Sequence, residues 1–232
     1  KRVGVHRYSF RTSASANILI DLHHGLGPDS VLESRMSIPN DTEITGFRRS
    51  KGWAKDQRVY FVARVSQPMT GHDIVLADTA ASHDSSAEGT NLRCIIRFAR
   101  MEHRSIVVKV GISAVSIDEA RRNLEAEVPG WNFEEIRSNA ETAWEHELGK
   151  IEVEGGTPDQ YATFYTALYH SLITPNLFSD ADGSYRGMDG TIHRANGFDM
   201  YTVFSLWDTF RAEHPLLTII DQRRTVDFVR SL

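Results

Sequence analysis

The stretch Ser105-Ile-Val-Val-Lys-Val-Gly-Ile-Ser113, followed by Ser116-Ile-Asp-Glu-Ala-Arg-Arg-Asn-Leu124, decides the fold because the spacing of its apolar residues changes there. In the first part every second residue is apolar, which is the pattern of a strand with one buried face. In the second part, Ser116 and Glu119 form a capping box ahead of apolar residues at helical spacing. The sequence therefore predicts a sheet-built part that ends near Ser113 and a helical part that follows it.

The same period of two runs through the residues before this stretch. Leu92, Cys94, Ile96 and Phe98 alternate with other residues, and the polar residues 101–104 predict a hairpin turn between this strand and the next. Six further strand-like stretches lie at residues 3–10, 16–22, 30–37, 43–47, 59–66 and 73–77. Eight short strands predict an antiparallel β-sandwich.

After Ser113 the predicted helices have recognisable start signals. One helix is expected to begin after Asn132 and to carry its charged residues on one face. Another begins at Thr157-Pro-Asp-Gln160, which combines a capping box with proline at the first helical position, and it ends at Pro175. Helical spacing returns at residues 201–213 and 218–232. Residues 176–200 follow neither period, and a loop of that length in a compact domain is usually functional.

The chain has 232 residues, 41% of them hydrophobic and 25% charged, which is ordinary globular material. Residues 1–113 contain 16 Lys and Arg against 11 Asp and Glu, a net charge of +5, whereas residues 114–232 contain 10 against 20, a net charge of −10. The overall charge of −5 argues against a nucleic-acid partner. Opposite charges on the two parts favour a polar interface between two docked domains.

Cysteine content and hydrophobic patterning limit the cellular setting only in part. Cys94 has no partner for an intrachain disulfide and is predicted to be a small buried residue. No stretch approaches the ~18 apolar residues needed to span a bilayer, so no membrane insertion is expected. The first residues show no signal-peptide order and already have a strand pattern, which leads us to expect that the native start lies upstream of Lys1.

The residues best suited to binding chemistry follow the third predicted helix. Carboxylates, aromatic rings and arginine occur together from residue 176 to residue 211, a combination that suits sugar recognition because flat rings cover sugar faces while carboxylates and guanidinium groups bond to hydroxyls. Any single Asp here is more simply explained as a turn residue. Asp180-Ala-Asp182-Gly183 begins like a calcium loop but lacks the later ligands, so we predict an Asx-type turn.

Two features of the first part have plainer explanations than binding chemistry. His23 and His24 are adjacent, so on a strand they point to opposite faces and are predicted to have a structural or surface role rather than to share a metal ion. The cations of Phe47-Arg-Arg-Ser-Lys51 lie near Trp53 and could face an acidic ligand or the acidic second part of the chain. The charge distribution favours the second option, an interface.

Several ordered motifs resemble glycoside hydrolase family 92. Upstream these are Ile44-Thr-Gly-Phe-Arg-Arg-Ser50 and Trp53-Ala54. Downstream they are Phe164-Tyr-Thr-Ala-Leu-Tyr-His-Ser-Leu172, Pro175-Asn-Leu-Phe-Ser-Asp180, Tyr185-Arg-Gly-Met-Asp-Gly190, Tyr201-Thr-Val-Phe-Ser-Leu-Trp-Asp-Thr-Phe-Arg211 and His214-Pro-Leu-Leu-Thr218.

This resemblance implies an α+β multidomain fold, with an antiparallel β-sandwich followed by the first helices of an (α/α)6 barrel. It assigns residues 1–113 to the sandwich, 114–160 to a helical linker region and 161–232 to the start of the barrel. Members of the family look like exo-acting α-mannosidases that invert configuration and require calcium. The implied substrate is a mannose-containing glycan, and the implied location is the periplasm or the exterior of the cell.

The resemblance also assigns roles to residues. Trp207 and Asp208 match the motif that lines the terminal-sugar subsite, and Arg186 and Asp189 match a neighbouring motif. The general acid, the general base and the calcium ligands are expected beyond Leu232. The missing remainder of its own catalytic domain is therefore an expected partner, and the isolated chain is expected to have no mannosidase activity.

Two functions of other classes remain open. In the first, the protein is a non-catalytic carbohydrate-binding module whose sugar site lies on the sandwich while the helices dock elsewhere. In the second, the acidic helical part is a protein-docking surface. A change at Asp208 separates the enzyme from the binding module, because only the enzyme places the sugar at that residue.

Overall fold

A computed structural model describes residues 1–232 apart from 11–15, 26, 28, 78–81 and 100–104. The chain divides into two compact units, Lys1–Phe133 and Glu134–Leu232. This packing boundary lies later than the change of pattern near Ser113, because helix α1 (Ile117–Glu127) packs on the strands of the first unit.

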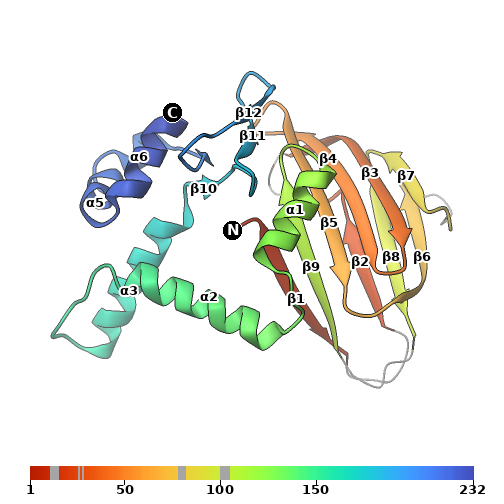
Figure 1. The fold of residues 1–232 in the computed structure, drawn as a ribbon, viewed down its shortest axis with the longest axis horizontal. Coiled ribbons are helices and arrows are strands. Elements are labelled where there is room, and N and C mark those ends of the chain that lie inside the picture. Colours follow the sequence, from red (N-terminus) through yellow and green to blue (C-terminus); the bar gives the residue numbers. More distant parts are fainter. Residues whose placement is uncertain (11–15, 26, 28, 78–81, 100–104) are drawn as a thin grey trace. The chain divides into compact units, whose positions relative to one another are not determined.

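The first unit is built from two antiparallel sheets, as Figure 1 shows. One sheet has six strands in the order β1-β9-β5-β4-β3-β7, and the other has three in the order β2-β8-β6. The strands are β1 (Val3–Ser9), β2 (Asn17–Asp21), β3 (Ser30–Asn40), β4 (Glu43–Lys51), β5 (Gln57–Val65), β6 (Met69–Leu76), β7 (Ser86–Gly89), β8 (Leu92–Phe98) and β9 (Ser105–Ser113). The predicted arrangement, a sandwich followed by helices, is confirmed.

The core of the first unit follows from the alternation in its strands. Along β8, every second side chain from Leu92 to Phe98 is buried, and these side chains pack against buried residues of the six-stranded sheet such as Met36 and Ile44. Cys94 is one of them, so the expected small buried residue is confirmed, and burial raises the pKa of its thiol to about 11. A thiol with such a pKa is a packing residue rather than a nucleophile at neutral pH.

Two details of the predicted strand pairing differ from the structure. The expected hairpin between the last two strands is wrong, because β8 pairs with β2 and β6 whereas β9 pairs with β1 and β5. The turn expected at residues 101–104 lies outside the described residues. Strand β7 was not predicted, since Ser-Ala-Glu-Gly has little strand propensity, and it pairs with β3 at the edge of the sheet.

Helix α1 lies against the outer face of the six-stranded sheet (Figure 1). The Ser116 part of its predicted capping box is confirmed, because the side chain of Ser116 accepts a hydrogen bond from the backbone N–H of Glu119. On the inner side, Ala120 and Leu124 are buried against Val62 of β5. The helix can approach this closely only because Gly111 has no side chain, since a Cβ atom there would lie 2.4 Å from the carbonyl oxygen of Ala120.

The second unit contains the remaining helices and four short strands. The helices are α2 (Phe133–Leu148), α3 (Pro158–Ile173), α4 (Leu206–Thr209), α5 (Glu213–Ile220) and α6 (Gln222–Ser231). The strands are β10 (Asn176–Leu177), β11 (Ser184–Arg186), β12 (Ile192–Arg194) and β13 (Tyr201–Thr202). The capping box of α3 is confirmed, because Thr157 and Gln160 exchange both predicted hydrogen bonds. Among the described residues, no helix is long and apolar enough to cross a membrane.

The helices predicted at the end of the chain are partly wrong. Tyr201 and Thr202 form strand β13, which pairs with β10, so the helical spacing over residues 201–213 describes only α4. The helix predicted over residues 218–232 is divided at Asp221, whose side chain accepts a hydrogen bond from the backbone N–H of Arg224 and caps α6. Pairing with a distant strand and a side-chain cap thus override the local spacing.

Candidate functional site

The segment between α3 and α4 is organised by carboxylates that bond to their own loop. The side chain of Asp182 accepts hydrogen bonds from the backbone N–H of Ser184 at 2.8 Å and from its hydroxyl at 2.9 Å. This is the predicted Asx-type turn, which is confirmed. It leads into β11, the first strand of the β11–β12 hairpin.

The described residues do not fit a calcium ion. In the part of the chain that the structure describes, no group of three or more His, Cys, Asp and Glu side chains is placed to hold a metal. Both carboxylate oxygens of Asp182 already accept hydrogen bonds from Ser184, although Ca²⁺ requires six to eight oxygen ligands. We therefore derive no chemical step through a metal from this chain.

Arg186 and Asp189 lie on the β11–β12 hairpin and shape its tip. The guanidinium group of Arg186 donates to the carbonyl oxygen of Gly190 at 2.8 Å. Asp189 accepts from the backbone N–H of Thr191 at 3.0 Å and from its hydroxyl at 2.8 Å, and it lies 3.0 Å from Nε2 of His193. The Thr191 N–H, then its hydroxyl and the imidazole, lower the pKa of the Asp189 carboxyl to about 2. The tip therefore carries an ionised carboxylate at any physiological pH.

Trp207 and Asp208 lie on α4, a helix of one turn. Trp207 is 88% exposed in this chain. The carboxylate of Asp208 accepts a hydrogen bond from the hydroxyl of Ser205, and its backbone N–H donates to the Ser205 carbonyl oxygen at 3.0 Å. Ser205 thus holds the carboxylate in place on the same helical turn that carries Trp207.

An exposed indole ring beside a fixed carboxylate can bind a sugar. The indole face can cover the apolar face of a pyranose, and the carboxylate can accept hydrogen bonds from its hydroxyl groups. The predicted pairs lie on two separate elements of the same unit, with Trp207 and Asp208 on α4 and Arg186 and Asp189 on the hairpin. The predicted residues therefore come from two different elements, one pair on each.

A small pocket beside α4 contains residues to which the sequence assigned no individual role. It has a volume of about 40 Å³, and its lining includes Ser205, Thr209, Glu213 and His214. The atoms Glu213 Oε1 and His214 Nε2 are buried and have no hydrogen-bond partner among the described residues. Burial raises the pKa of the Glu213 carboxyl, and the charge of His214 offsets this only in part. Sequence spacing could not have found these residues, because their isolation from partners is a property of the packing.

The backbone ahead of α4 is strained. Val203, which also lines this pocket, has a φ of 66°, in the left-handed region that β-branched residues rarely adopt. Strain of this kind persists only where the surroundings hold it, and it is common at ligand sites. The conformation of the segment that carries Trp207 is therefore imposed by its neighbours.

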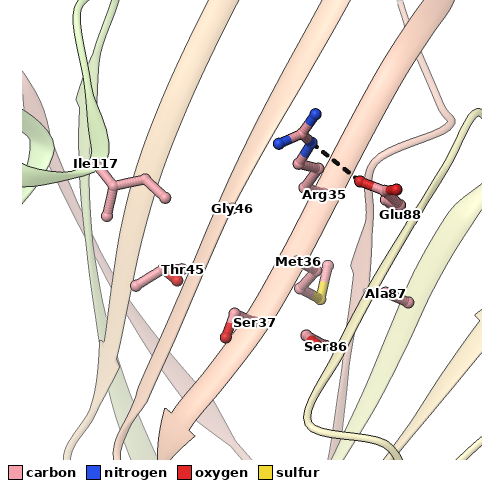
Figure 2. A pocket seen from close by; sticks show the side chains of 9 residues that line it. All are labelled: Arg35, Met36, Ser37, Thr45, Gly46, Ser86, Ala87, Glu88 and Ile117. Atoms are coloured by element: carbon pink, nitrogen blue, oxygen red, sulfur yellow. Dashed lines mark ion pairs between the residues drawn. The ribbon is translucent and has the colours of Figure 1, made fainter.

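The first unit has a larger and more open pocket, which is relevant to a sugar site on the sandwich (Figure 2). It has a volume of about 430 Å³ and lies beside Ile117 at the start of α1. Arg35 and Glu88 form an ion pair of 3.2 Å at one end, and hydroxyl groups line the floor. Its lining residues are Arg35, Met36, Ser37, Thr45, Gly46, Ser86, Ala87, Glu88 and Ile117, none of them aromatic. A pocket without an aromatic lining residue cannot stack a sugar ring, which disfavours this sandwich site.

The basic segment near Trp53 is ordered by ion pairs within the sandwich. Arg48 lies 2.8 Å from Asp29, and Arg49 lies 2.7 Å from Asp56. Trp53 is 98% exposed. The interface role of this segment stays a prediction.

The adjacent histidines of the first unit belong to a local turn. The carboxylate of Asp21 accepts hydrogen bonds from the backbone N–H groups of His23 at 2.7 Å and His24 at 3.0 Å. Nδ1 of His23 lies 3.2 Å from the carbonyl oxygen of Thr90. These contacts account for the segment as a structural turn, in line with the sequence interpretation.

Comparison with known protein families shows that two domains of one family together match nearly the whole chain. The N-terminal domain of glycosyl hydrolase family 92 matches residues 1–113, and the catalytic domain of the same family matches residues 119–232. Residues 114–118 alone lie outside both matches.

Solved structures of similar proteins agree with these matches. A family GH92 α-mannosidase from Bacteroides thetaiotaomicron has a TM-score of 0.91 and 39% identity, with coverage of 99% of this chain and 31% of that protein. An inverting mannosidase of the family from strain VPI-5482 of the same organism has a TM-score of 0.83 and 28% identity, with coverage of 94% and 29%. An uncharacterized secreted glycosidase from Arthroderma benhamiae is 42% identical over 78 residues. The chain spans about a third of the length of these solved relatives.

Proposed function

This chain belongs to glycosyl hydrolase family 92, and from that membership we propose that it forms the β-sandwich and the first catalytic-domain helices of an exo-acting α-mannosidase. Two solved relatives are described as mannosidases, and one of them was also solved in complex with mannoimidazole. These descriptions support a glycoside hydrolase whose substrate is a mannose-containing glycan.

One observation of this structure supports the proposal: the one-turn helix α4 carries both the exposed Trp207 and Asp208, whose carboxylate Ser205 holds. We assign the terminal mannose to this pair, with the indole ring against the sugar face and the carboxylate accepting from sugar hydroxyls. Arg186 and Asp189 then belong to a neighbouring part of the sugar site. Their side chains form hydrogen bonds within the hairpin tip, so we propose that they support the sugar site by holding the conformation of that tip.

The chemical step requires groups that we place in the remainder of the catalytic domain. Inversion uses a general acid and a general base, with their carboxyl groups about 6.5–9.5 Å apart to admit a water molecule. Calcium, when bound, would help to hold and distort the sugar, and its ligands belong to the same remainder. The residues of this chain bind and orient the substrate. We propose a periplasmic or secreted location, and of these two the description of the Arthroderma benhamiae relative supports the secreted one.

The proposal is tested with the intact protein that contains this chain and with α-mannobiose as substrate. Proton NMR should show release of mannose from the non-reducing end, with the β-anomer appearing first because the enzyme inverts configuration. Removal of calcium with a chelator should abolish the release, and added Ca²⁺ should restore it. Initial formation of the α-anomer would contradict inversion, full activity in chelator would contradict the calcium requirement, and no release from any α-mannoside would contradict the proposed function.

A further inference from the structure

The pocket beside α4 is lined by two buried polar atoms that have no hydrogen-bond partner among the described residues, and it has room for a small molecule such as water. Glu213 Oε1 and His214 Nε2 are both buried and without a hydrogen-bond partner among the described residues, and both residues line this pocket. A buried polar atom that stays unpaired carries a free-energy penalty, so native structures rarely leave two of them side by side. The volume of about 40 Å³ exceeds the ~10–15 Å³ that a cavity needs in order to hold one water molecule.

The other polar groups of the pocket can complete the hydrogen bonds of such a water molecule. The hydroxyl of Ser205 donates to Asp208, and the hydroxyl of Thr209 donates to the Ser205 carbonyl oxygen at 3.1 Å. Each hydroxyl oxygen keeps lone pairs that can accept a further bond. A water molecule donates two hydrogen bonds and accepts others, and buried water in proteins usually has two to four polar partners. Ser205, Thr209, Glu213 and His214 supply that number.

The two residues are also placed to act on α4. They begin α5, and the ring of His214 packs edge-on against Phe228 of α6 at a centroid distance of 6.1 Å. The strained Val203 and Ser205, which holds Asp208, also line the pocket. A hydrogen-bonded link across the pocket would therefore connect α5, which packs on α6, to the segment that carries Trp207 and Asp208.

We propose that Glu213 and His214 hold one water molecule in this pocket and, through its hydrogen bonds to Ser205 and Thr209, fix the position of α4. They are positioning residues for Trp207 and Asp208. The role of that pair rests on the proposed function, but the water bridge does not, because it can be measured on the chain in the absence of sugar.

The direct test is a crystal structure of the intact protein that contains this chain, without sugar. The expected result is one ordered water molecule within hydrogen-bond distance of both Glu213 Oε1 and His214 Nε2. A dry pocket, or a change of side-chain position that pairs the two atoms with other protein groups, would overturn the proposal.

The sign of a stability change provides a second test. If the two atoms are truly unpaired, Glu213→Leu and His214→Phe remove a penalty and leave the melting midpoint unchanged or raise it. If they hold a water molecule, each variant removes one of its hydrogen-bond partners and leaves Ser205 and Thr209 without the bonds that the water provided. We then expect the melting midpoint to fall by about 2–4 °C. Glu213→Gln keeps an oxygen at the same place and should stay near the wild type, as should the exposed control Ile219→Ala on the same helix. An unchanged or raised midpoint in either apolar variant would overturn the bridge.

The positioning role has its own readout, the indole N–H signal of Trp207 in a nitrogen–proton NMR spectrum, assigned by comparison with Trp207→Phe. Glu213→Leu and His214→Phe should move this signal, whereas Glu213→Gln and Ile219→Ala should not. A lower midpoint with an unmoved signal would show that the two residues stabilise the unit without positioning α4. If either apolar variant fails to fold, the crystal structure decides the outcome alone. None of these measurements involves sugar, so failure of the mannosidase proposal would not change them.

Discussion

Lys109 of β9 is a buried cation whose surroundings explain how it is tolerated. Its side chain is 2% exposed, and its amine lies 3.0, 3.4 and 3.1 Å from the carbonyl oxygens of Val128, Pro129 and Gly130. It also lies 4.1 Å from the ring centroid of Trp131. Burial lowers the pKa of this amine, as expected for a cation removed from water. The amine binds the carbonyl groups that follow α1, so it fixes the end of that helix.

This arrangement predicts the effect of removing the amine. Lys109→Met keeps most of the side-chain volume but leaves carbonyl groups without a donor, so we expect the free energy of unfolding to fall by about 1–3 kcal/mol. The measurement is urea unfolding, with Lys55→Met in the exposed β4–β5 loop as the matched control. A loss no larger than that of the control would contradict the account.

The roles of individual residues were predictable where a side chain bonds to the backbone a few residues away. They were not predictable where the role depends on residues that are distant in sequence. The caps at Ser116 and Thr157 follow from side chains that reach backbone groups three residues away. Glu213 and His214 stand out only because packing leaves their atoms without partners. The exposure of Trp207 belongs to this second kind, since helical spacing alone does not say which face is covered.

Gly111 shows how one position sets the distance between two elements. An added Cβ atom would lie 2.4 Å from the Ala120 carbonyl oxygen and 2.8 Å from the Leu124 side chain, so α1 would have to move off the sheet. We expect Gly111→Ala to reduce the free energy of unfolding by about 1–3 kcal/mol, the usual cost of overpacking. Gly71→Ala is the matched control, because its Cβ would meet nothing closer than the Arg97 side chain at 3.7 Å. Equal effects of the two changes, measured by urea unfolding, would contradict the close packing of α1.

A network of ion pairs joins the end of α2 to the start of α6. Lys150 lies 2.7 Å from Glu147 and 2.6 Å from Asp221, and Arg224 lies 2.9 Å from Glu147. Burial alone would raise the pKa of both carboxyl groups, but the hydrogen bond from Lys150 and the charge of Arg224 outweigh it, so both pKa values are lowered. The stabilisation is therefore fully present above the unfolded pKa of about 4 and is lost as the pH falls through the lower folded values.

The pH dependence of unfolding checks this network. Asp221→Asn keeps an oxygen that can cap α6 but removes the charge, so we expect a loss of about 1–3 kcal/mol at pH 7. The difference between wild type and variant should shrink as the pH falls below about 4. Glu152→Gln, at an exposed site, is the control. A difference that stays constant from pH 7 to pH 3 would contradict the role of the charge.

Elements were predictable from the sequence where local pattern and packing agree. The alternation of apolar residues correctly predicted strand β8 and its buried face. Alternation does not show which strand lies next to it, and the predicted hairpin with β9 was therefore wrong. Strand β7 forms because β3 offers it backbone partners rather than through its own composition. The same reason explains β13, where pairing with β10 overrides helical spacing.

On the scale of the whole molecule, we propose that this chain contributes to substrate binding. It spans about a third of the α-mannosidases that it resembles in structure. We predict that the isolated 232-residue chain releases no mannose from an aryl α-mannoside or from mannobiose, because our proposal places the acid and base required for inversion in the remainder of the catalytic domain. The assay is product detection against the intact enzyme as the positive control. Turnover by the isolated chain would show that it holds its own catalytic carboxylates.

The central claim is that the sugar binds at α4 and not on the sandwich. Calorimetric titration of the intact protein with methyl α-mannoside tests it most directly, with Asp208→Ala compared to Arg35→Ala in the sandwich pocket. Loss of a charged hydrogen bond should weaken binding to Asp208→Ala by about 10- to 100-fold, while Arg35→Ala should bind like the wild type. The opposite result, weak binding by Arg35→Ala and unchanged binding by Asp208→Ala, would contradict the account and place the sugar on the sandwich.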